Sequence, residues 1–472
     1  MYNNSLLYRQ LLQDHTEEEA NEYMEEELQK REITDYTEFI NDYKKEYTPE
    51  NIVKYVDFIS FFQLDIQNKF SEYILHKYIL NLKYLDLICN FHCILFVIEK
   101  FCNEENDRLT NDILLYITSH VIIKELNLYN NFGVKNDGLK NCTYLKKLNI
   151  KNNHSITNLD VMAETLIELN ISGFCDIGDN ELKNCINLQI LNAGGNKKIT
   201  TCKPFSNSLI ELIASGNCGI DDKGLLNCSK LQKLIADDNM KITDCSPFSN
   251  TLILLYAAGD CGIEDEGLKN CKKIQILDAD GNPRIKTCDP FAYSLIDLNA
   301  SEYFHEDLRC GLGDEGLKNC INLQKLNANN NPKITTCDPF ANSLIQLETS
   351  SDSGIDDKGL LNCIKLQILN VWGNEKITTC EPFAKTLLKL TTGYSAIDDI
   401  AIQNCTNLQM LDASYNKRIT TCKPFANSLI ELSACSFSGI DNEGIKDCKN
   451  LKKLFSFDNR KITIKIENKN NL

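Results

Sequence analysis

Apolar residues recur in a fixed pattern along most of this 472-residue chain. From residue 123 onward, segments read Leu-x-x-Leu-x-(Ala, Leu or Ile), as in LQILNA from Leu188 and LIELIA from Leu209. Alternate side chains of a β-strand point to the same face, so Leu191 and Ala193 are predicted to face a core. The pattern therefore predicts a short strand at the start of each of many similar units.

Cysteines mark the period of this repetition. Eight of them recur at intervals of 43, 43, 43, 49, 43, 42 and 43 residues, from Cys142 to Cys448. Each period contains two units, and a fixed period of this kind is typical of solenoids, in which neighbouring units share one core. We count 16 units, which begin at Ile123, Leu145, Leu166, Leu188, Leu209, Leu231, Leu252, Ile274, Leu295, Leu323, Leu344, Leu366, Leu387, Leu408, Leu429 and Leu451.

These units resemble the leucine-rich repeat family, whose repeats are about 20–29 residues long. The stretch GIDDKGLLNC is similar to the Gly-(Ile/Leu)-x-Asp-x-Gly-Leu segment of cysteine-containing repeats, which implies a short helix on the convex side. We call the segment that leads from one strand to the next a return. In the other type of unit the return is TTCKPFSNS, which contains Pro204 and is predicted to be irregular or a 3-10 turn. The resemblance implies an α/β solenoid, a horseshoe with a parallel concave sheet. The Asn-, Lys- and Ile-rich composition resembles proteins of AT-rich protists and large DNA viruses.

Two further residue types repeat with the units. An asparagine lies eight residues after the first leucine of every second unit, and it resembles the asparagine ladder of the family, in which a buried amide satisfies backbone groups. A phenylalanine in the Pro-containing return is predicted to stack as an aromatic spine. The asparagines are Asn153, Asn196, Asn239, Asn282, Asn331, Asn374, Asn416 and Asn459, and the phenylalanines are Phe205, Phe248, Phe291, Phe340, Phe383 and Phe425.

The chain has 22 cysteines, which raises the question of disulfides. Equivalent cysteines occur in every second unit, about 10 Å apart at ~4.8 Å per strand, whereas a disulfide needs Cα atoms within about 7 Å. The Cys142 to Cys448 series and a second series (Cys202, Cys245, Cys288, Cys337, Cys380 and Cys422) are therefore predicted to be small buried hydrophobes.

The sequence also bears on the compartment. Residues 1–10 do not read as a signal peptide, and residues 84–102 are too often interrupted by polar groups for a membrane span. With so many thiols in addition, we expect an intracellular, cytoplasmic protein (in the host cytoplasm if it is viral).

Residues 1–118 lack the repeat and are predicted to form an acidic helical N-terminal domain or cap. Residues 1–120 carry 23 acidic and 11 basic side chains, and helices are predicted over 48–79 (two), 85–101 and 111–120. Residues 43–79 are similar to the C-terminal helices of BTB/POZ and Skp1-like domains, and the matching residues are Glu50, Asn51, Ile52, Val56, Phe62, Gln63 and Leu64. The solenoid is predicted to span 119–465, with a polar tail over 466–472.

Candidate chemistry adds little to this interpretation. The net charge of −16 argues against nucleic-acid and membrane partners, and no phosphate-binding loop or nucleophile elbow indicates an enzyme or a cofactor. The group His76, Cys89, His92, Cys93 and Cys102 lacks a zinc spacing and is predicted to pack in a helical core, which leaves no metal site. Paired carboxylates in GIDDKG and GIEDEG suit calcium or, more simply, helix N-capping.

The remaining hypothesis is a non-enzymatic scaffold that binds a protein partner of unknown identity on its concave face. Outward strand positions form a predicted apolar stripe about 25 Å long, and a second group surrounds the single tryptophan; the residues are Ile190, Ile213, Ile235, Leu254, Tyr256, Ile276, Ile368, Trp372 and Met410. Exposed apolar clusters mark protein interfaces. A loop at 303–309 is a secondary contact candidate. The alternative is a substrate-recognition adaptor of a ubiquitin ligase, with ligase components bound by the N-terminal domain.

Overall fold

The computed structural model describes residues 109–302 and 309–464. The chain divides into two compact units, residues 1–199 and 200–472. The predictions for residues 1–108, including the BTB-like stretch and the His/Cys group, lie outside the described residues, as do most of the loop at 303–309 and the polar tail. The boundary proposed between residues 118 and 119 falls within a helix over residues 111–120, and both proposed domain boundaries stay predictions.

The helix predicted over residues 111–120 is confirmed as α8 (Asn111–His120). Thr110 caps its amino end by accepting a hydrogen bond from the backbone N–H of Ile113, as residues with side-chain oxygens do at this position. Its apolar side is buried through Ile113, Leu114 and Ile117. The side chain of Asn131 donates to the carbonyl of Leu109 at 3.0 Å, which ties the start of the helix to the first repeat.

The first unit holds four short parallel strands in the part described. Neighbouring strands pair in register, so that the middle leucines lie side by side, as Leu126 does with Leu148. Because each strand is followed by a return to the same edge, the strands run parallel and share one core. The elements are β1 (Glu125–Asn127), η3 (Asn136–Leu139), β2 (Lys147–Asn149), β3 (Glu168–Asn170), α9 (Asp179–Leu182) and β4 (Ile190–Asn192).

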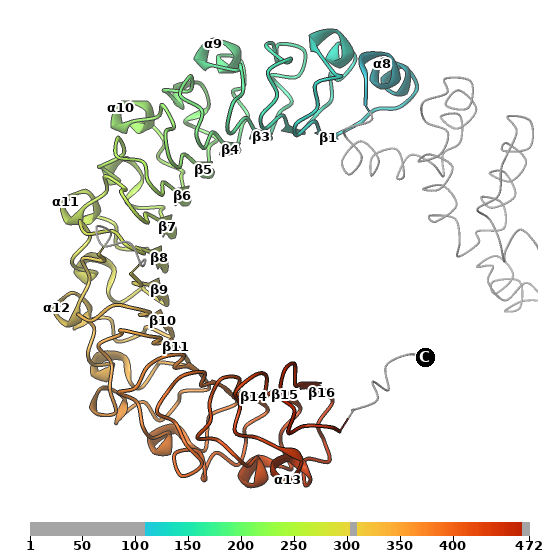
Figure 1. Ribbon diagram of the computed structural model, residues 1–472. Helices are drawn as coiled ribbons and strands as arrows, with labels where there is room; N and C mark the ends of the chain where they lie inside the picture. Colours follow the sequence, from blue (N-terminus) through green and yellow to red (C-terminus); the bar gives the residue numbers. More distant parts are fainter. Residues whose placement is uncertain (1–108, 303–308, 465–472) are drawn as a thin grey trace, which may run out of the picture. The chain divides into compact units, whose positions relative to one another are not determined.

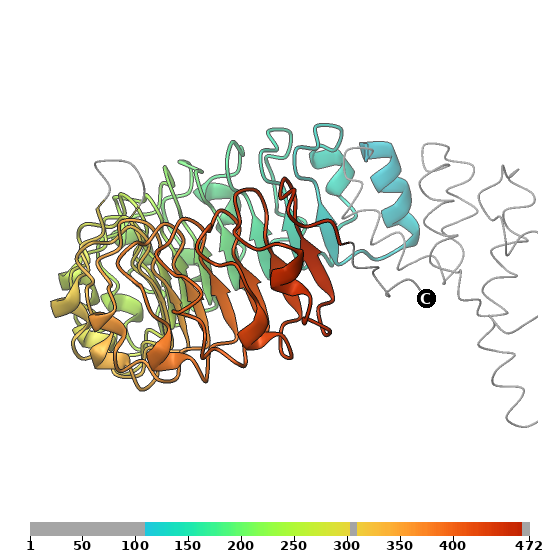
Figure 2. The ribbon, with the colours of Figure 1, turned by 60° about the horizontal axis from the view of Figure 1, so that its bottom comes forward.

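The second unit continues the same repeat through β5 to β16. Its strands also pair in parallel and in register, and Figure 1 shows them on the inner side of the unit, with α10 to α13 on the outer side. Figure 2 shows the strands lying side by side. The strands are β5 (Glu211–Ile213), β6 (Lys233–Ile235), β7 (Leu254–Tyr256), β8 (Ile276–Asp278), β9 (Asp297–Asn299), β10 (Lys325–Asn327), β11 (Gln346–Glu348), β12 (Ile368–Asn370), β13 (Lys389–Thr391), β14 (Met410–Asp412), β15 (Glu431–Ser433) and β16 (Lys453–Phe455).

The returns alternate as the sequence indicates. Short helical turns follow the GIDD-type segments, and 3-10 turns that carry proline at the first or second position follow the cysteines, where the missing N–H of proline costs nothing. Each unit is therefore a leucine-rich repeat solenoid. The turns of the second unit are η4 (Lys203–Phe205), α10 (Asp222–Leu225), η5 (Ser246–Phe248), α11 (Asp265–Leu268), η6 (Asp289–Phe291), α12 (Asp314–Leu317), η7 (Asp338–Phe340), η8 (Lys358–Leu360), η9 (Glu381–Phe383), η10 (Lys423–Phe425) and α13 (Asn442–Ile445).

The asparagine ladder is present, and the phenylalanines of the predicted spine are buried, although no ring-to-ring contact joins them among the described residues. The six predicted phenylalanines are the largest fully buried side chains among the described residues. Asn282 shows how the ladder works: its amide donates to the carbonyl of Ala257 at 2.7 Å and its oxygen accepts from the N–H of Arg284 at 2.8 Å. One side chain thus satisfies a turn of its own unit and the backbone of the unit before it.

Most of the cysteines occupy the core, as predicted. Of the nineteen described cysteines seventeen are buried, while Cys435 and Cys448 are half-buried. Cysteines of the two series also approach one another, because the thiols of Cys245 and Cys271 form a hydrogen bond. The spacing between equivalent cysteines of one series does not reveal this contact. This bond, and then burial, raise the pKa of Cys245.

Candidate functional site

The predicted stripe residues lie at outward strand positions of the inner sheet and are half-buried. In the second unit, Ile213, Ile235 and Tyr256 are aligned across β5, β6 and β7. Leu254 and Ile276 form a second, neighbouring row across β7 and β8. We call these five residues the concave apolar patch. Ile190 occupies the first position of β4 in the first unit.

Carboxylates adjoin the concave apolar patch. Asp237 follows β6, Asp278 ends β8, and Asp280 follows two residues later. Burial, and then the neighbouring charges of Asp278, Asp238 and Asp280, raise the pKa of Asp237. Burial also raises the pKa of Asp280, whose carboxylate accepts from the hydroxyl of Ser301 at 2.7 Å. Among the described residues no lysine or arginine forms an ion pair with these four carboxylates, so this part of the sheet presents uncompensated negative charge.

The second predicted group separates into two places. Ile368 and Met410 lie at the first positions of β12 and β14, with Lys389 between them in the sheet. Trp372 lies two residues beyond the end of β12, in the turn, where its backbone N–H donates to the side-chain oxygen of Asn370 at 3.1 Å. Its aromatic neighbours are Tyr394 and Tyr415, with which it forms a cluster that the sequence pattern did not indicate.

That cluster is a row of four aromatic side chains, each from the turn after one of the strands β12 to β15. We call it the aromatic ledge: Trp372, Tyr394, Tyr415 and Phe437. The two tyrosine rings are stacked, with centroids 5.1 Å apart and planes 19° apart. The indole meets both rings edge-on, at 5.6 and 5.8 Å between centroids. Phe437 extends the row beyond Tyr415 at 6.4 Å. Tyr394 and Phe437 are 55% and 65% exposed, so much of the ledge faces solvent.

The backbone under the ledge is strained. Tyr394 and Tyr415 adopt φ values of 54° and 60°, in the left-handed region that bulky residues rarely enter. The same turn elsewhere in the described residues holds only glycine, asparagine, aspartate or serine at positive φ. Holding a tyrosine there costs on the order of 1–3 kcal/mol. The two tyrosine rings are therefore held in these turns despite the unfavourable backbone conformation.

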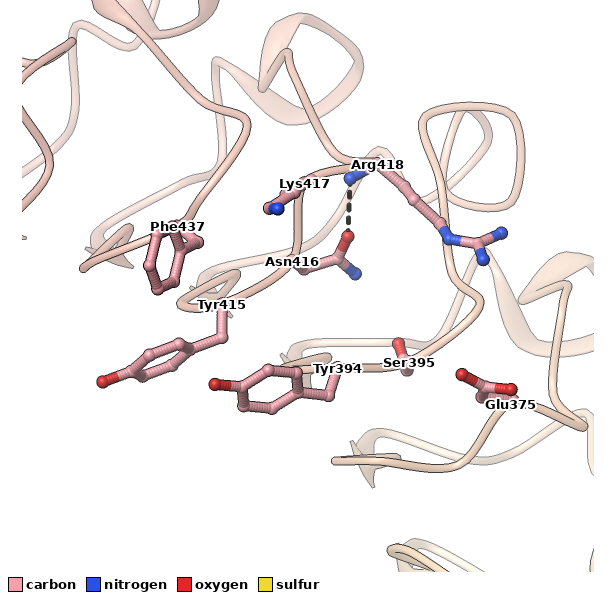
Figure 3. A pocket seen from close by; sticks show the side chains of 8 residues that line it. All are labelled: Glu375, Tyr394, Ser395, Tyr415, Asn416, Lys417, Arg418 and Phe437. Atoms are coloured by element: carbon pink, nitrogen blue, oxygen red, sulfur yellow. Dashed lines mark hydrogen bonds between the residues drawn. The ribbon is translucent and has the colours of Figure 1, made fainter.

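A hollow of about 440 Å³ borders the ledge, as Figure 3 shows. Tyr394, Tyr415 and Phe437 line one part of it, and Glu375, Lys417 and Arg418 add charged groups. The ammonium of Lys417 lies 5.3 Å from the centre of the Phe437 ring, a favourable cation–π contact. Below them, the amide of Asn416 accepts from the N–H of Arg418 at 2.8 Å, so the ladder also holds this turn.

The paired carboxylates of the GIDD-type segments have structural partners. Asp221 accepts from the N–H of Gly224 at 3.0 Å and caps α10. Asp222 accepts from the N–H and the hydroxyl of Thr243 in the following repeat, at 2.7 and 2.6 Å. These bonds account for both carboxylates of this segment, of which Asp221 is an N-cap as predicted. In the GIEDEG segment Glu264 makes no capping bond, so N-capping does not hold there, and Asp265 instead accepts from the N–H groups of Lys286 and Thr287.

The described ranges contain no grouping of three or more histidine, cysteine or acidic side chains suited to holding a metal ion. Within them, no helix has the length and apolar character that crossing a membrane requires. The surfaces that stand out are therefore the concave apolar patch and the aromatic ledge.

No protein-family model matches this sequence, and a search of curated proteins finds no relative. Several solved structures are similar to it. An internalin (inlF) from Listeria monocytogenes is 22% identical, with 71% of this chain and 94% of that chain covered and a TM-score of 0.44. The TLR13–ssRNA13 complex is 17% identical over 75% and 67%, with a TM-score of 0.46. The functional domain of InlJ from Listeria monocytogenes, which includes a cysteine ladder, is 17% identical over 73% and 64%, with a TM-score of 0.37.

Proposed function

We propose that this chain is a non-enzymatic scaffold that binds a partner protein on the inner sheet of its second unit. The concave apolar patch carries the proposal. Three apolar side chains, Ile213, Ile235 and Tyr256, stand in register on adjacent strands and remain partly open to solvent. Apolar groups that remain on a surface between charged neighbours mark interfaces, and tyrosine is enriched among the residues that dominate binding.

The neighbouring charge defines the chemistry of the partner. Asp237, Asp238, Asp278 and Asp280 form no ion pair with a described lysine or arginine. Attraction to a positively charged segment would lower the pKa values that burial raises at Asp237 and Asp280. A partner segment that combines aliphatic side chains with lysine or arginine would complement both features. Complementary charge sets the rate and specificity of association more than its strength.

The test compares the full-length protein with a Tyr256→Ser/Ile235→Ser variant as bait for partners from cell lysate, followed by titration of the purified partner. Tyr293→Ser is the matched control, because Tyr293 is 72% exposed and lies in the η6 return rather than on the inner sheet. We expect the partner to bind the double variant at least about tenfold more weakly, and to bind the control like the unmodified chain.

Salt dependence provides a second readout. Binding driven partly by the four carboxylates is expected to weaken as ionic strength rises, because exposed charges are screened beyond about 8–10 Å at physiological salt. A partner that the double variant retains with unchanged affinity would refute the concave surface as its binding site.

A further inference from the structure

The aromatic ledge is a second surface, separate from the concave apolar patch. Its four residues come from the turns after β12 to β15, whereas the patch lies on β5 to β8. The four ledge residues occupy three different positions in their repeats, yet their rings meet one another in a continuous row. Half of the units carry no aromatic residue at these turn positions, and among the described residues ring contacts join such residues only in these four consecutive repeats.

The turn geometry indicates that the two tyrosines are present for their rings. At positive φ, the described turns hold Asn130, Asn152, Gly173, Gly195, Gly216, Asp238, Gly259, Gly281, Asn330, Ser351, Gly373, Ser436 and Asp458. Only Tyr394 and Tyr415 depart from this set, and they belong to adjacent repeats. Strained residues of this kind persist where surrounding structure holds them, and they gather at ligand-binding sites.

The charges beside the rings favour an acidic ligand. The hollow has two cations, Lys417 and Arg418, and one carboxylate, Glu375. Neither cation forms an ion pair with another described residue, and Lys417 is held over Phe437. Figure 3 shows Arg418 and Glu375 on the side of the hollow away from Phe437. The guanidinium of Arg418 is therefore available to donate two parallel hydrogen bonds to one carboxylate.

We propose that the aromatic ledge and its hollow bind an extended, proline-containing acidic segment of a partner protein. The proline side chains of a polyproline II helix pack into aromatic-lined grooves. Such segments lose little conformational entropy on binding because they are already extended. Tyrosine hydroxyls donate to the exposed carbonyls of such a segment. An Asp or Glu side chain of the segment pairs with Arg418 or Lys417.

Single-stranded nucleic acid is the other polymer that stacks on aromatic rows beside cations. The surface favours a peptide instead, because Glu375 stands in the hollow and the whole chain carries a net charge of −16. Both features oppose a phosphate backbone, which carries a negative charge at every nucleotide, more strongly than a peptide segment that needs only one or two carboxylates to pair with Lys417 and Arg418. The two ligands are distinguished by direct measurement.

The experiment pans a random phage-displayed library of 12-residue peptides on the full-length protein, with prior depletion on a Tyr394→Asn/Tyr415→Asn variant. Asparagine occupies this turn position at Asn130, Asn152 and Asn330, so the variant keeps a residue that the backbone accepts. The most enriched sequence is synthesised with a fluorescein label, and its affinity is measured by fluorescence anisotropy. A fluorescein-labelled 12-residue oligo(U) serves as the nucleic-acid probe.

We expect a consensus with proline and at least one Asp or Glu. Its affinity should fall at least about tenfold in the double variant and in Arg418→Gln, and should weaken with salt. Tyr293→Ala, which removes an exposed tyrosine elsewhere, and Tyr256→Ser, in the concave apolar patch, should leave it unchanged. The last control separates this site from the proposed concave site, so that either can fail alone.

The proposal would be overturned by enrichment of no peptide that distinguishes the two proteins, by a consensus without acidic residues, or by tighter binding of oligo(U) than of every enriched peptide. Circular dichroism and thermal melting of each variant show whether it is folded. A double variant that melts with the unmodified chain and still binds the peptide equally well would also contradict the assignment.

Discussion

The asparagine ladder allows a quantitative prediction, because each rung has defined partners. Asn282 is fully buried. Its amide donates to the carbonyl of Ala257 at 2.7 Å and to that of Ile263 at 3.5 Å, and its oxygen accepts from the N–H of Arg284 at 2.8 Å. Alanine at this position removes all three bonds and leaves their backbone partners buried.

The expected cost follows from these three bonds. A typical hydrogen bond contributes about 1 kcal/mol to stability, and a buried group left without a partner costs about 1–3 kcal/mol. The bond of 3.5 Å contributes little, so we expect Asn282→Ala to lower the free energy of unfolding by about 3 kcal/mol. Asn322→Ala is the matched control. Asn322 is exposed, and its amide donates to the carbonyl of Tyr293 at 2.8 Å, so its loss should cost less than about 0.5 kcal/mol.

Urea unfolding at equilibrium measures both variants, followed by far-ultraviolet circular dichroism and by the fluorescence of Trp372, the only tryptophan in the chain. Coincident transitions by the two probes and unchanged m values would justify a comparison of free energies. If Asn282→Ala and Asn322→Ala unfolded with the same free energy, the ladder would contribute nothing beyond exposed hydrogen bonds, and the argument would be wrong.

Two further predictions concern the core. Burial raises the pKa of the thiols of Cys142, Cys185, Cys261 and Cys310 to about 12. Above pH ~9 these thiols lose their protons in the unfolded chain but keep them in the folded chain. The free energy of unfolding should therefore fall by about 1.4 kcal/mol per pH unit for each thiol. Urea midpoints that stay constant from pH 8 to 10.5 would contradict this. Phe291→Ala, in the buried spine, should cost about 3–5 kcal/mol in the same assay, whereas Tyr293→Ala, two residues away and exposed, should cost little; equal costs would refute the role of the spine.

The repeated core could be predicted from the sequence because each core residue plays the same structural role in every unit in which it recurs. The inward leucine and the alanine two residues after it, the asparagine eight residues after the first leucine, and the phenylalanine after proline all lie where the pattern indicates. Helix α8 is likewise found over the predicted residues, since Thr110 and the apolar side of the helix are both visible in the sequence. Local periodicity is sufficient for these features.

The aromatic ledge could not be predicted in this way. Trp372 lies six residues after the first leucine of its unit, Tyr394 and Tyr415 seven, and Phe437 eight. No single repeat position therefore shows them together, and their ring contacts are visible only in the folded chain. The one available signal was the pair of tyrosines at a position that otherwise holds small or polar residues. The thiol pairs between the two cysteine series were missed for the same reason, because only equivalent positions were compared.

The strain under the ledge connects its stability to its proposed role. Replacing Tyr394 with asparagine relieves a backbone penalty on the order of 1–3 kcal/mol, and it removes ring contacts with Trp372 and Tyr415 worth about 0.5–1.5 kcal/mol each. The two effects are of the same order, so we expect Tyr394→Asn to change the free energy of unfolding little. A small change would be consistent with a tyrosine that is present for what its exposed ring contacts, as proposed above. The core residues of the same repeat, by contrast, are fully explained by their partners within the chain.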